Sequence, residues 1–437
     1  MPAIAEDGGA PPLTVRRALV RAFRSIIRLY FREIERVGEP PSADTRGRVF
    51  VSNHHNALID PILVLTDAAC EISPIAKSTL WSIPGLRWLL DRAGAVPIVR
   101  RKDAPDKDAS QNAEMFAKIA AHLAGGGNVL IFPEGTSHSE PHLAPLRTGA
   151  ARMLVAAAER GGVPPTFQAV ALEFDARDDF RSRCLVLWGP VRRLDELGSD
   201  GDGEREVRAI TARMDADLRE LLVEGDSHDA RRLVARVAEM LANDAGDASL
   251  SGWSTIGRQV EAAAALLRDA DPSVVAHVAA RIDAYYAELA RFGLGDAQLA
   301  VPRAAAHKPR SRWIRRAALA PLAAPGIALY AIPYFIPRMI ARRADPDAVS
   351  TVKLGTALLV YPLWAAGLVA LSFVLIPPPL SLAAAAVVVA SPFAALRWLD
   401  AYWNRAPGHH ATGDDLARLA RLRIAARTAI DDARARL

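Results

Sequence analysis

The stretch NHHNALID, residues 53–60, stands between two apolar runs, VFVS at 49–52 and PILVL at 61–65. The first run is typical of a buried strand, and the second begins a helical pattern. Two imidazoles therefore follow the end of a strand, and Asp60 falls at the start of the next helix. This arrangement can hold a base beside the carboxylate that orients it, so we take it as the candidate active site.

Taken alone, His54, His55 and Asp60 admit three interpretations. Imidazole and carboxylate can bind zinc or iron, but no further cluster of His, Cys or acidic residues stands close in the sequence. In a second interpretation, a histidine only caps the following helix. In the third, a histidine is a general base, because imidazole titrates near neutrality and an adjacent carboxylate fixes its tautomer and supports its protonated form.

Around this stretch, from residue 48 to about 194, short apolar runs alternate with helical patterns. We expect strands at 49–52, 72–76, 95–99, 129–132, 167–174 and 184–188, and helices at 58–69, 84–92, 109–124 and 148–160. The alternation predicts an α/β domain over 46–200, with a mixed, mostly parallel sheet flanked by helices. Loops at the ends of such strands are where chemistry is expected.

A second motif, VLIFPEGTS at 129–137, is a strand that ends in a Pro-Glu-Gly turn. An acid at the carboxyl end of a strand, followed by a residue that lets the backbone approach a ligand closely, indicates substrate binding. Pro and Gly also form ordinary β-turns, so Glu134 and Gly135 alone do not decide between the two.

The rest of the chain falls into segments of different composition. Residues 1–45 predict a polar tail and a basic amphipathic helix at 15–37, which either lies in a membrane interface or packs on the domain. The other expected segments are a helical extension at 201–301, a basic linker at 302–316, a membrane-associated region at 317–400 and a charged helical tail at 401–437.

The membrane-associated region holds two uncharged tracts, 317–337 and 354–396. A spanning helix needs about 20 apolar residues, and a triple proline at 377–379 divides the second tract into a helical hairpin. Lys353 and Arg397 flank this hairpin, which places both of its ends in the cytoplasm. Because four prolines interrupt 317–337, we expect a re-entrant segment there.

The charge and composition of the chain indicate which classes of partner it can bind. The formal charge is +5 and the pI about 9.4, which suits anionic partners such as membrane lipids and phosphorylated substrates. The basic residues are dispersed and no basic groove with interleaved aromatic residues is evident, so we expect no nucleic acid as partner. Two cysteines and the lack of a secretory signal in the polar start favour a reducing, cytoplasmic-side location.

The order of the motifs makes a family resemblance specific. The histidine and aspartate stretch followed by FPEG at 132–135 resembles the glycerolipid acyltransferase family, and GAVPIVR at 94–100 and VPPTFQAVA at 163–171 match two more of its blocks in the family's order. The resemblance covers about residues 45–195. Residues 137–152, SHSEPHLAPLRTGAAR, are similar to the family's glycerol-3-phosphate/dihydroxyacetone-phosphate acyltransferase-like branch.

The resemblance implies transfer of a fatty acyl group to glycerol 3-phosphate or 1-acylglycerol 3-phosphate in phospholipid biosynthesis. The co-substrate is then acyl-CoA or an acylated carrier protein, with no other cofactor and no metal. Alternative acceptors are a lysophospholipid or dihydroxyacetone phosphate. The enzyme is expected in the cytoplasmic membrane, with its catalytic domain on the cytoplasmic side.

The resemblance also implies roles for single residues. Most of the family places four residues between histidine and aspartate, which selects His55 with Asp60, whereas the branch's spacing of five selects His54, with Asn56 as a further site residue; we favour His54 slightly. Glu134, Gly135 and Thr136 are expected to position the acceptor.

The phosphate of the acceptor needs cationic side chains. The family often carries Arg where this chain has Ser137, so that role falls to other residues. Candidates are Arg100, Arg101, Arg147 and Lys77, since guanidinium groups bind phosphate oxygens in a fork. Arg is also the common surface cation in this chain.

Two functions of other classes compete. A membrane-anchored lipid hydrolase would use Ser137 or Ser52 as nucleophile, but no Gly-x-Ser-x-Gly elbow occurs. An inactive lipid-binding protein would keep the fold without the activity. AVA at 169–171 departs from the Val-Pro-Val type of sequence that is usual in the family, which leaves room for that alternative.

Overall fold

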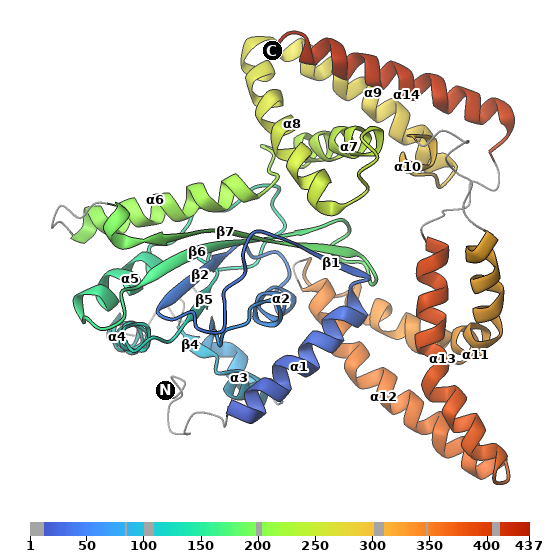
Figure 1. Ribbon diagram of the computed structural model, residues 1–437, viewed down its shortest axis with the longest axis horizontal. Coiled ribbons are helices and arrows are strands. Elements are labelled where there is room, and N and C mark those ends of the chain that lie inside the picture. Colours follow the sequence, from blue (N-terminus) through green and yellow to red (C-terminus); the bar gives the residue numbers. More distant parts are fainter. Residues whose placement is uncertain are drawn as a thin grey trace. The chain divides into compact units, whose positions relative to one another are not determined.

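The computed structural model divides into two compact units, Met1–Glu224 and Gly225–Leu437 (Figure 1). The residues that it describes are 13–83, 85–99, 109–197, 203–300, 310–346, 348–403 and 411–437. Most of the expected N-terminal tail and most of the expected linker lie outside these ranges, as do Arg100 and Arg101.

The described part of the first unit contains a seven-stranded sheet with the order β1-β7-β6-β2-β5-β3-β4. The strands are β1 (Glu33–Val37), β2 (Arg48–Ser52), β3 (Ser73–Lys77), β4 (Val96–Ile98), β5 (Val129–Ile131), β6 (Thr166–Phe174) and β7 (Arg183–Arg193). Neighbouring strands are parallel except β6 and β7, which are antiparallel. The expected α/β class with a mixed, mostly parallel sheet is confirmed.

Strand β2 lies between β6 and β5, and its apolar run explains this central position. Val49, Phe50 and Val51 are fully buried. A continuous apolar run without alternation is typical of a parallel strand that is covered on both faces. Helices of this unit are α1 (Leu13–Tyr30), α2 (Ile59–Asp67), α3 (Leu86–Ala93), α4 (Ala109–Ala124), α5 (Gly149–Glu159) and α6 (Gly203–Leu221), with short 3-10 turns at Ser78–Ser82 and Leu194–Leu197.

The amphipathic helix is shorter than expected. We predicted a helix over 15–37, but α1 ends at Tyr30 and residues 33–37 form β1, a strand at the edge of the sheet that pairs with β7. The buried Phe31 stacks on Phe174 and fixes the change of direction. Arg36 then forms an ion pair with Asp67, so the strand is tied to the end of α2.

Helix α1 packs on its own unit. Ile27 and Tyr30 are buried, and the Arg24 guanidinium donates to the carbonyl of Thr66 at 2.9 Å. Arg16 reaches the carbonyl of Ile72. The sequence left open whether this helix lies in a membrane interface or packs on the domain. The structure shows that one face of α1 packs on the domain.

The second unit holds helices of two kinds. A cluster of buried apolar side chains joins α7 (His228–Asp244), α8 (Leu250–Ala270), α9 (Pro272–Arg291) and α14 (Gly413–Arg434), with the short α10 (Ala297–Ala300) beside α7. These helices agree with the expected helical extension and helical tail, except that α6 belongs to the first unit.

Helices α11 (Arg310–Ala341), α12 (Val349–Leu375) and α13 (Leu380–Trp403) pack against one another. In the described residues, three segments are long and apolar enough to cross a membrane: Ala317–Ala341, Val349–Leu375 and Leu380–Asp400. The helical hairpin was expected. Helix α11 continues through the four prolines of 317–337, and residues 310–316 of the expected linker are its first turns. The expected re-entrant course of 317–337 in a membrane stays a prediction.

Candidate active site

The candidate site lies where β2 and β5 end. The two strands are parallel and neighbouring, with Val51 opposite Ile131. Because the carboxyl ends of parallel strands meet at one edge of a sheet, the segments after Ser52 and Ile131 leave the sheet side by side. The two sequence motifs, more than seventy residues apart, are thereby brought into contact: the carbonyl of His54 accepts a hydrogen bond from the backbone N–H of His138 at 3.2 Å.

Asp60 is in the first turn of α2 and is fully buried. Its Oδ2 atom lies 2.9 Å from Nδ1 of the His54 ring and accepts the backbone N–H groups of His55 at 2.8 Å and Asn56 at 2.7 Å. A buried carboxylate requires such donors, since its desolvation is otherwise costly. The bond to Asp60 makes Nδ1 of His54 the donor and leaves Nε2 as the acceptor of a proton.

The His54 ring is fixed on its other side by Phe132. The two rings are stacked, with centroids 4.1 Å apart and planes at 19°. The His54 side chain keeps 17% of its surface exposed, whereas Asp60 has none. An imidazole that is oriented by a buried acid, held flat by an aromatic ring and still reachable from outside has the geometry of a general base.

His55 is arranged differently, although it is the next residue. Its ring Nδ1 lies 3.1 Å from the carbonyl oxygen of His138, and the two histidine rings meet edge to face at 5.4 Å. Its bond to Asp60 comes from the backbone N–H. The structure therefore pairs the ring of His54, the alternative that we favoured, with the aspartate.

Glu134 is buried and both of its carboxylate oxygens are engaged. Oε1 accepts the backbone N–H of His54 at 2.8 Å. Oε2 accepts the backbone N–H of Ala144 at 2.9 Å and is paired with Nε2 of His138. The carboxylate of Glu134 thus connects His54, which follows β2, to the loop after β5. The sequence predicted a contact of Glu134 with the acceptor but not these contacts within the protein.

Gly135 provides space for Arg147. Its φ of +77° lies in the left-handed region, and a Cβ atom at this position would lie 2.6 Å from Nε of Arg147. The backbone N–H of Arg147 donates to the carbonyl of Pro133 at 2.8 Å. The exposed side chain of Arg147 therefore lies against the Pro-Glu-Gly turn. This places a cation at the edge of the sheet that carries His54 and Glu134.

The other predicted site residues are distributed unevenly. Lys77 is exposed and ends β3 at the same edge of the sheet. Thr136 lies in the turn itself, where its hydroxyl donates to the carbonyl of Ser137 at 3.3 Å. Asn56 is fully buried, with an amide that has no hydrogen-bond partner among the described residues, and its expected role as a further site residue stays a prediction.

Sequence reasoning missed two residues of the site, His138 and Arg177. Arg177 follows β6, and its guanidinium lies 3.5 Å from the carbonyl of His55 and donates to Oγ of Ser139 at 3.2 Å. His138 could have been found from the sequence, because it is an ionisable residue only four positions after Glu134. Arg177 gave none, because it reaches the site only through the pairing of β6 with β2.

The described residues hold no group of three or more His, Cys, Asp or Glu side chains arranged to bind a metal ion. The chemical capacity of the site lies in one oriented imidazole, the buried carboxylates behind it and the cations of the neighbouring loops. This combination can remove a proton from a hydroxyl group beside an anionic substituent.

Comparison with known proteins relates the part of the chain that holds His54, Asp60 and Glu134 to acyltransferases. The acyltransferase family model matches residues 31–171. A chloroplastic 1-acyl-sn-glycerol-3-phosphate acyltransferase of Brassica napus is 30% identical over 140 residues, which are 32% of this chain and 37% of that protein. Glycerol-3-phosphate O-acyltransferase 2 of Saccharomyces cerevisiae is 37% identical over 82 residues, which are 18% of this chain and 11% of that protein.

Among solved structures, the 1-acyl-sn-glycerophosphate acyltransferase PlsC of Thermotoga maritima aligns with a TM-score of 0.31 and 14% identity, over 46% of this chain and 81% of that chain. The matches span 37% of the plant protein's length and 11% of the yeast protein's length, so this chain covers well under two thirds of either relative. The family model covers β1, β2, β5 and the motifs that carry His54, Asp60 and Glu134. Residues 31–171 are therefore a domain of the acyltransferase family.

Proposed function

We propose that this protein is a membrane-bound O-acyltransferase that moves a fatty acyl group from acyl-CoA or an acylated carrier protein to glycerol 3-phosphate or 1-acylglycerol 3-phosphate. The observation that carries the proposal is the pair of His54 and Asp60, with Nδ1 to Oδ2 at 2.9 Å. The names of the plant and yeast relatives supply the acceptors that are tested first.

In the proposed reaction, Nε2 of His54 removes the proton from an acceptor hydroxyl as its oxygen attacks the thioester carbonyl. The new C–O bond forms and the C–S bond breaks. The departing thiolate takes the proton back from the imidazolium, so the products are an ester and a free thiol. Asp60 supports the imidazolium while it exists.

Glu134 acts in this proposal as a positioning residue. It binds the backbone of His54, the ring of His138 and the backbone of Ala144, so it fixes the base relative to the loop after β5. The contact of Glu134 with the acceptor that the family resemblance implied stays a prediction beside this role.

Arg147 is the proposed main contact for the acceptor phosphate, with Lys77 and Arg177 as further cations at the same edge. A guanidinium binds two phosphate oxygens at once, and Arg147 lies on a turn whose glycine leaves room for it. Arg100 and Arg101 stay predictions from the sequence.

The three apolar helices of the second unit fit a membrane protein. We place the enzyme in the cytoplasmic membrane with the catalytic domain on the cytoplasmic side, where acyl-CoA and acylated carrier protein are found. Both cysteines of the chain are free and buried, in keeping with a reducing compartment.

The test uses the full-length protein in membranes. Labelled acyl-CoA or acylated carrier protein is supplied with glycerol 3-phosphate, 1-acylglycerol 3-phosphate, dihydroxyacetone phosphate and neutral lysophospholipids, and the lipids are separated. We expect an ester of one of the first two acceptors that disappears in the His54→Ala variant. A product with another acceptor would keep the acyl transfer and correct the substrate. Free fatty acid as sole product would indicate the hydrolase, and no product with any pair would overturn the proposal.

A further inference from the structure

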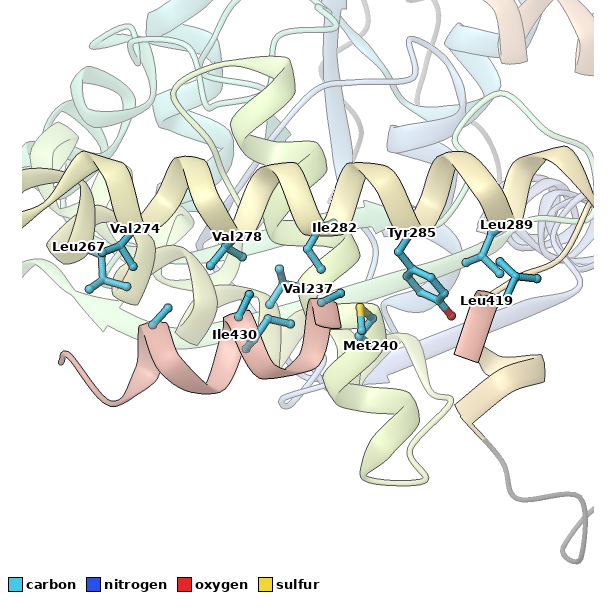
Figure 2. Packing of buried hydrophobic residues seen from close by; sticks show 13 residues of the cluster. Val237, Met240, Leu267, Val274, Val278, Ile282, Tyr285, Leu289, Leu419 and Ile430 are labelled. Atoms are coloured by element: carbon cyan, nitrogen blue, oxygen red, sulfur yellow. The ribbon is translucent and has the colours of Figure 1, made fainter. Parts of the chain in front are cut away.

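The C-terminal helix α14 completes a helical module whose other members precede the apolar helices in the sequence. Figure 2 shows Leu419 of α14 beside Leu289 of α9, and Ile430 near Val278. These four side chains belong to one buried cluster, to which α7 contributes Met240. Because α14 buries apolar side chains against α9, in a cluster that α7 also lines, it is part of the module's core.

Ion pairs fix the register of α14. Arg423 pairs with Asp244 at 2.6 Å and with Asp296 at 2.8 Å, and Arg427 pairs with Asp244 at 2.9 Å. Asp296 is fully buried, and it also accepts the hydroxyl of Tyr285 at 2.7 Å. Removing one partner of a buried carboxylate is strongly destabilising, so the ion pair of Asp296 with Arg423 favours this one position of α14 over others.

This packing restricts the membrane topology. Helices α9 and α14 must lie in the same aqueous compartment, although all three apolar helices stand between them in the sequence. The chain between them therefore crosses the membrane an even number of times. Three crossings, which length and composition alone would allow, are excluded.

The charges indicate which helix does not cross. The turn between α12 and α13 carries no charge, and its neighbours are exposed, with Val374 at 78% and Leu380 at 63%. Helix α11, in contrast, has basic residues at both ends, four before the apolar part and three after it: Arg310, Arg312, Arg315, Arg316, Arg338, Arg342 and Arg343. By the positive-inside rule, both of its ends stay on the cytoplasmic side.

Helix α11 contacts the hairpin away from its turn. Its Tyr330 stacks on Tyr361 of α12 and donates to the carbonyl of Val388 at 3.0 Å, and Gly326 closely approaches Ser391. The large apolar residues next to the turn, Val374, Leu375 and Leu380, stay exposed. An apolar helix that packs near the middle of a hairpin and leaves the apolar residues beside its turn uncovered can enter the membrane without leaving on the other side.

We propose that α12 and α13 cross the membrane as a hairpin, and that α11 lies in the lipid leaflet on the side of the catalytic domain without crossing. The partner of the outer face of α11 is then the acyl region of that leaflet, which Ile332, Phe335 and Met339 contact. The C-terminus returns to the compartment of α9. The inference does not depend on the acyl transfer.

The test is labelling of single cysteines with a membrane-impermeant maleimide, in intact bacterial cells and after permeabilisation. The native thiols give little background, because burial raises the pKa of Cys70 to about 11 and the pKa of Cys184 above its usual value. New cysteines are placed at exposed positions on α9, between α11 and α12, in the hairpin turn and on α14: Ala287→Cys, Asp345→Cys, Pro377→Cys and Ala420→Cys.

We expect Pro377→Cys to react in intact cells and the other three only after permeabilisation. Reaction of Asp345→Cys in intact cells would show that α11 crosses, and reaction of Ala420→Cys alone would show that α14 is separated from α9; either result overturns the proposal. So does a Pro377→Cys that reacts only after permeabilisation. Arg423→Ala should lower the thermal midpoint in detergent, whereas the exposed control Arg421→Ala should not, and equal midpoints for both would contradict the packing.

Discussion

Oδ2 of Asp60 binds both histidines of the motif, but in different ways: the ring of His54 lies 2.9 Å away and the backbone N–H of His55 lies 2.8 Å away. Two adjacent imidazoles are thus separated into one that the carboxylate orients and one that points toward the carbonyl of His138. The sequence left both registers open, and the fold of residues 53–60 around the start of α2 selects one of them.

The first prediction distinguishes the histidines by mutation. His54→Ala should lower kcat by about a hundredfold or more, the usual contribution of a general base. His55→Ala should cost about tenfold at most, because it removes one hydrogen bond worth about 1 kcal/mol. Initial rates with saturating substrates measure both. A larger loss of kcat in His55→Ala than in His54→Ala would assign the base to His55 and contradict the geometry.

The second prediction concerns Glu134. Glu134→Gln keeps one acceptor oxygen but turns a donor toward the N–H of Ala144 or toward His138, so both kcat and the thermal midpoint should fall. The exposed Glu140 lies on the same loop, and Glu140→Gln is the matched control that should change neither. If Glu134→Gln raised only KM for the acceptor, with an unchanged midpoint, Glu134 would contact the acceptor instead.

The different roles of these residues show what the sequence could predict. Apolar runs at 49–52 and 129–132 predicted the two strands that carry the motifs, because buried parallel strands are continuous in hydrophobicity. Strand β1 was missed because Glu33, Glu35 and Arg36 interrupt its pattern, as an edge strand allows. The contacts of Glu134 and Arg177 depend on loops that meet only after distant strands have paired, which no local pattern records.

The four prolines of α11 do not break the helix, for a physical reason. A proline leaves the carbonyl four residues earlier without its helical partner, which was one ground for expecting a re-entrant segment at 317–337. Here the carbonyl of Leu329, which Pro333 frees, accepts the indole N–H of Trp364 from α12 at 2.9 Å. A neighbouring helix thus supplies the missing bond, and this compensation cannot be seen in the sequence of α11.

The third prediction tests Gly135 through Arg147. Gly135→Ala places a Cβ atom where it would lie 2.6 Å from Nε of Arg147, so the guanidinium must move. KM for a phosphorylated acceptor should rise about as much as in Arg147→Gln, with the Michaelis constant for acyl-CoA unchanged. Acceptor titrations at fixed acyl-CoA measure this.

Gly161→Ala is the control for backbone strain. Gly161 also has a left-handed φ, +70°, but nothing lies within 4 Å of its Cβ position. This variant should lose about 1–2 kcal/mol of stability from strain and keep its KM. Equal effects of the two alanine variants on KM would show that strain alone explains Gly135, and that Arg147 does not bind the phosphate.

The last prediction concerns a second proline, Pro392 of α13. It frees the carbonyl of Val388, which accepts the Tyr330 hydroxyl of α11 at 3.0 Å. Tyr330→Phe should therefore destabilise the bundle by about 0.6 kcal/mol, and by up to about 1.7 kcal/mol, the range for side-chain hydrogen bonds in membranes. In a Pro392→Ala background the new N–H can bond to Val388 instead, so the same change should cost less. A double-mutant cycle, measured by unfolding in detergent, compares the two costs. Equal costs would mean that the hydroxyl does not replace the bond that the proline removes.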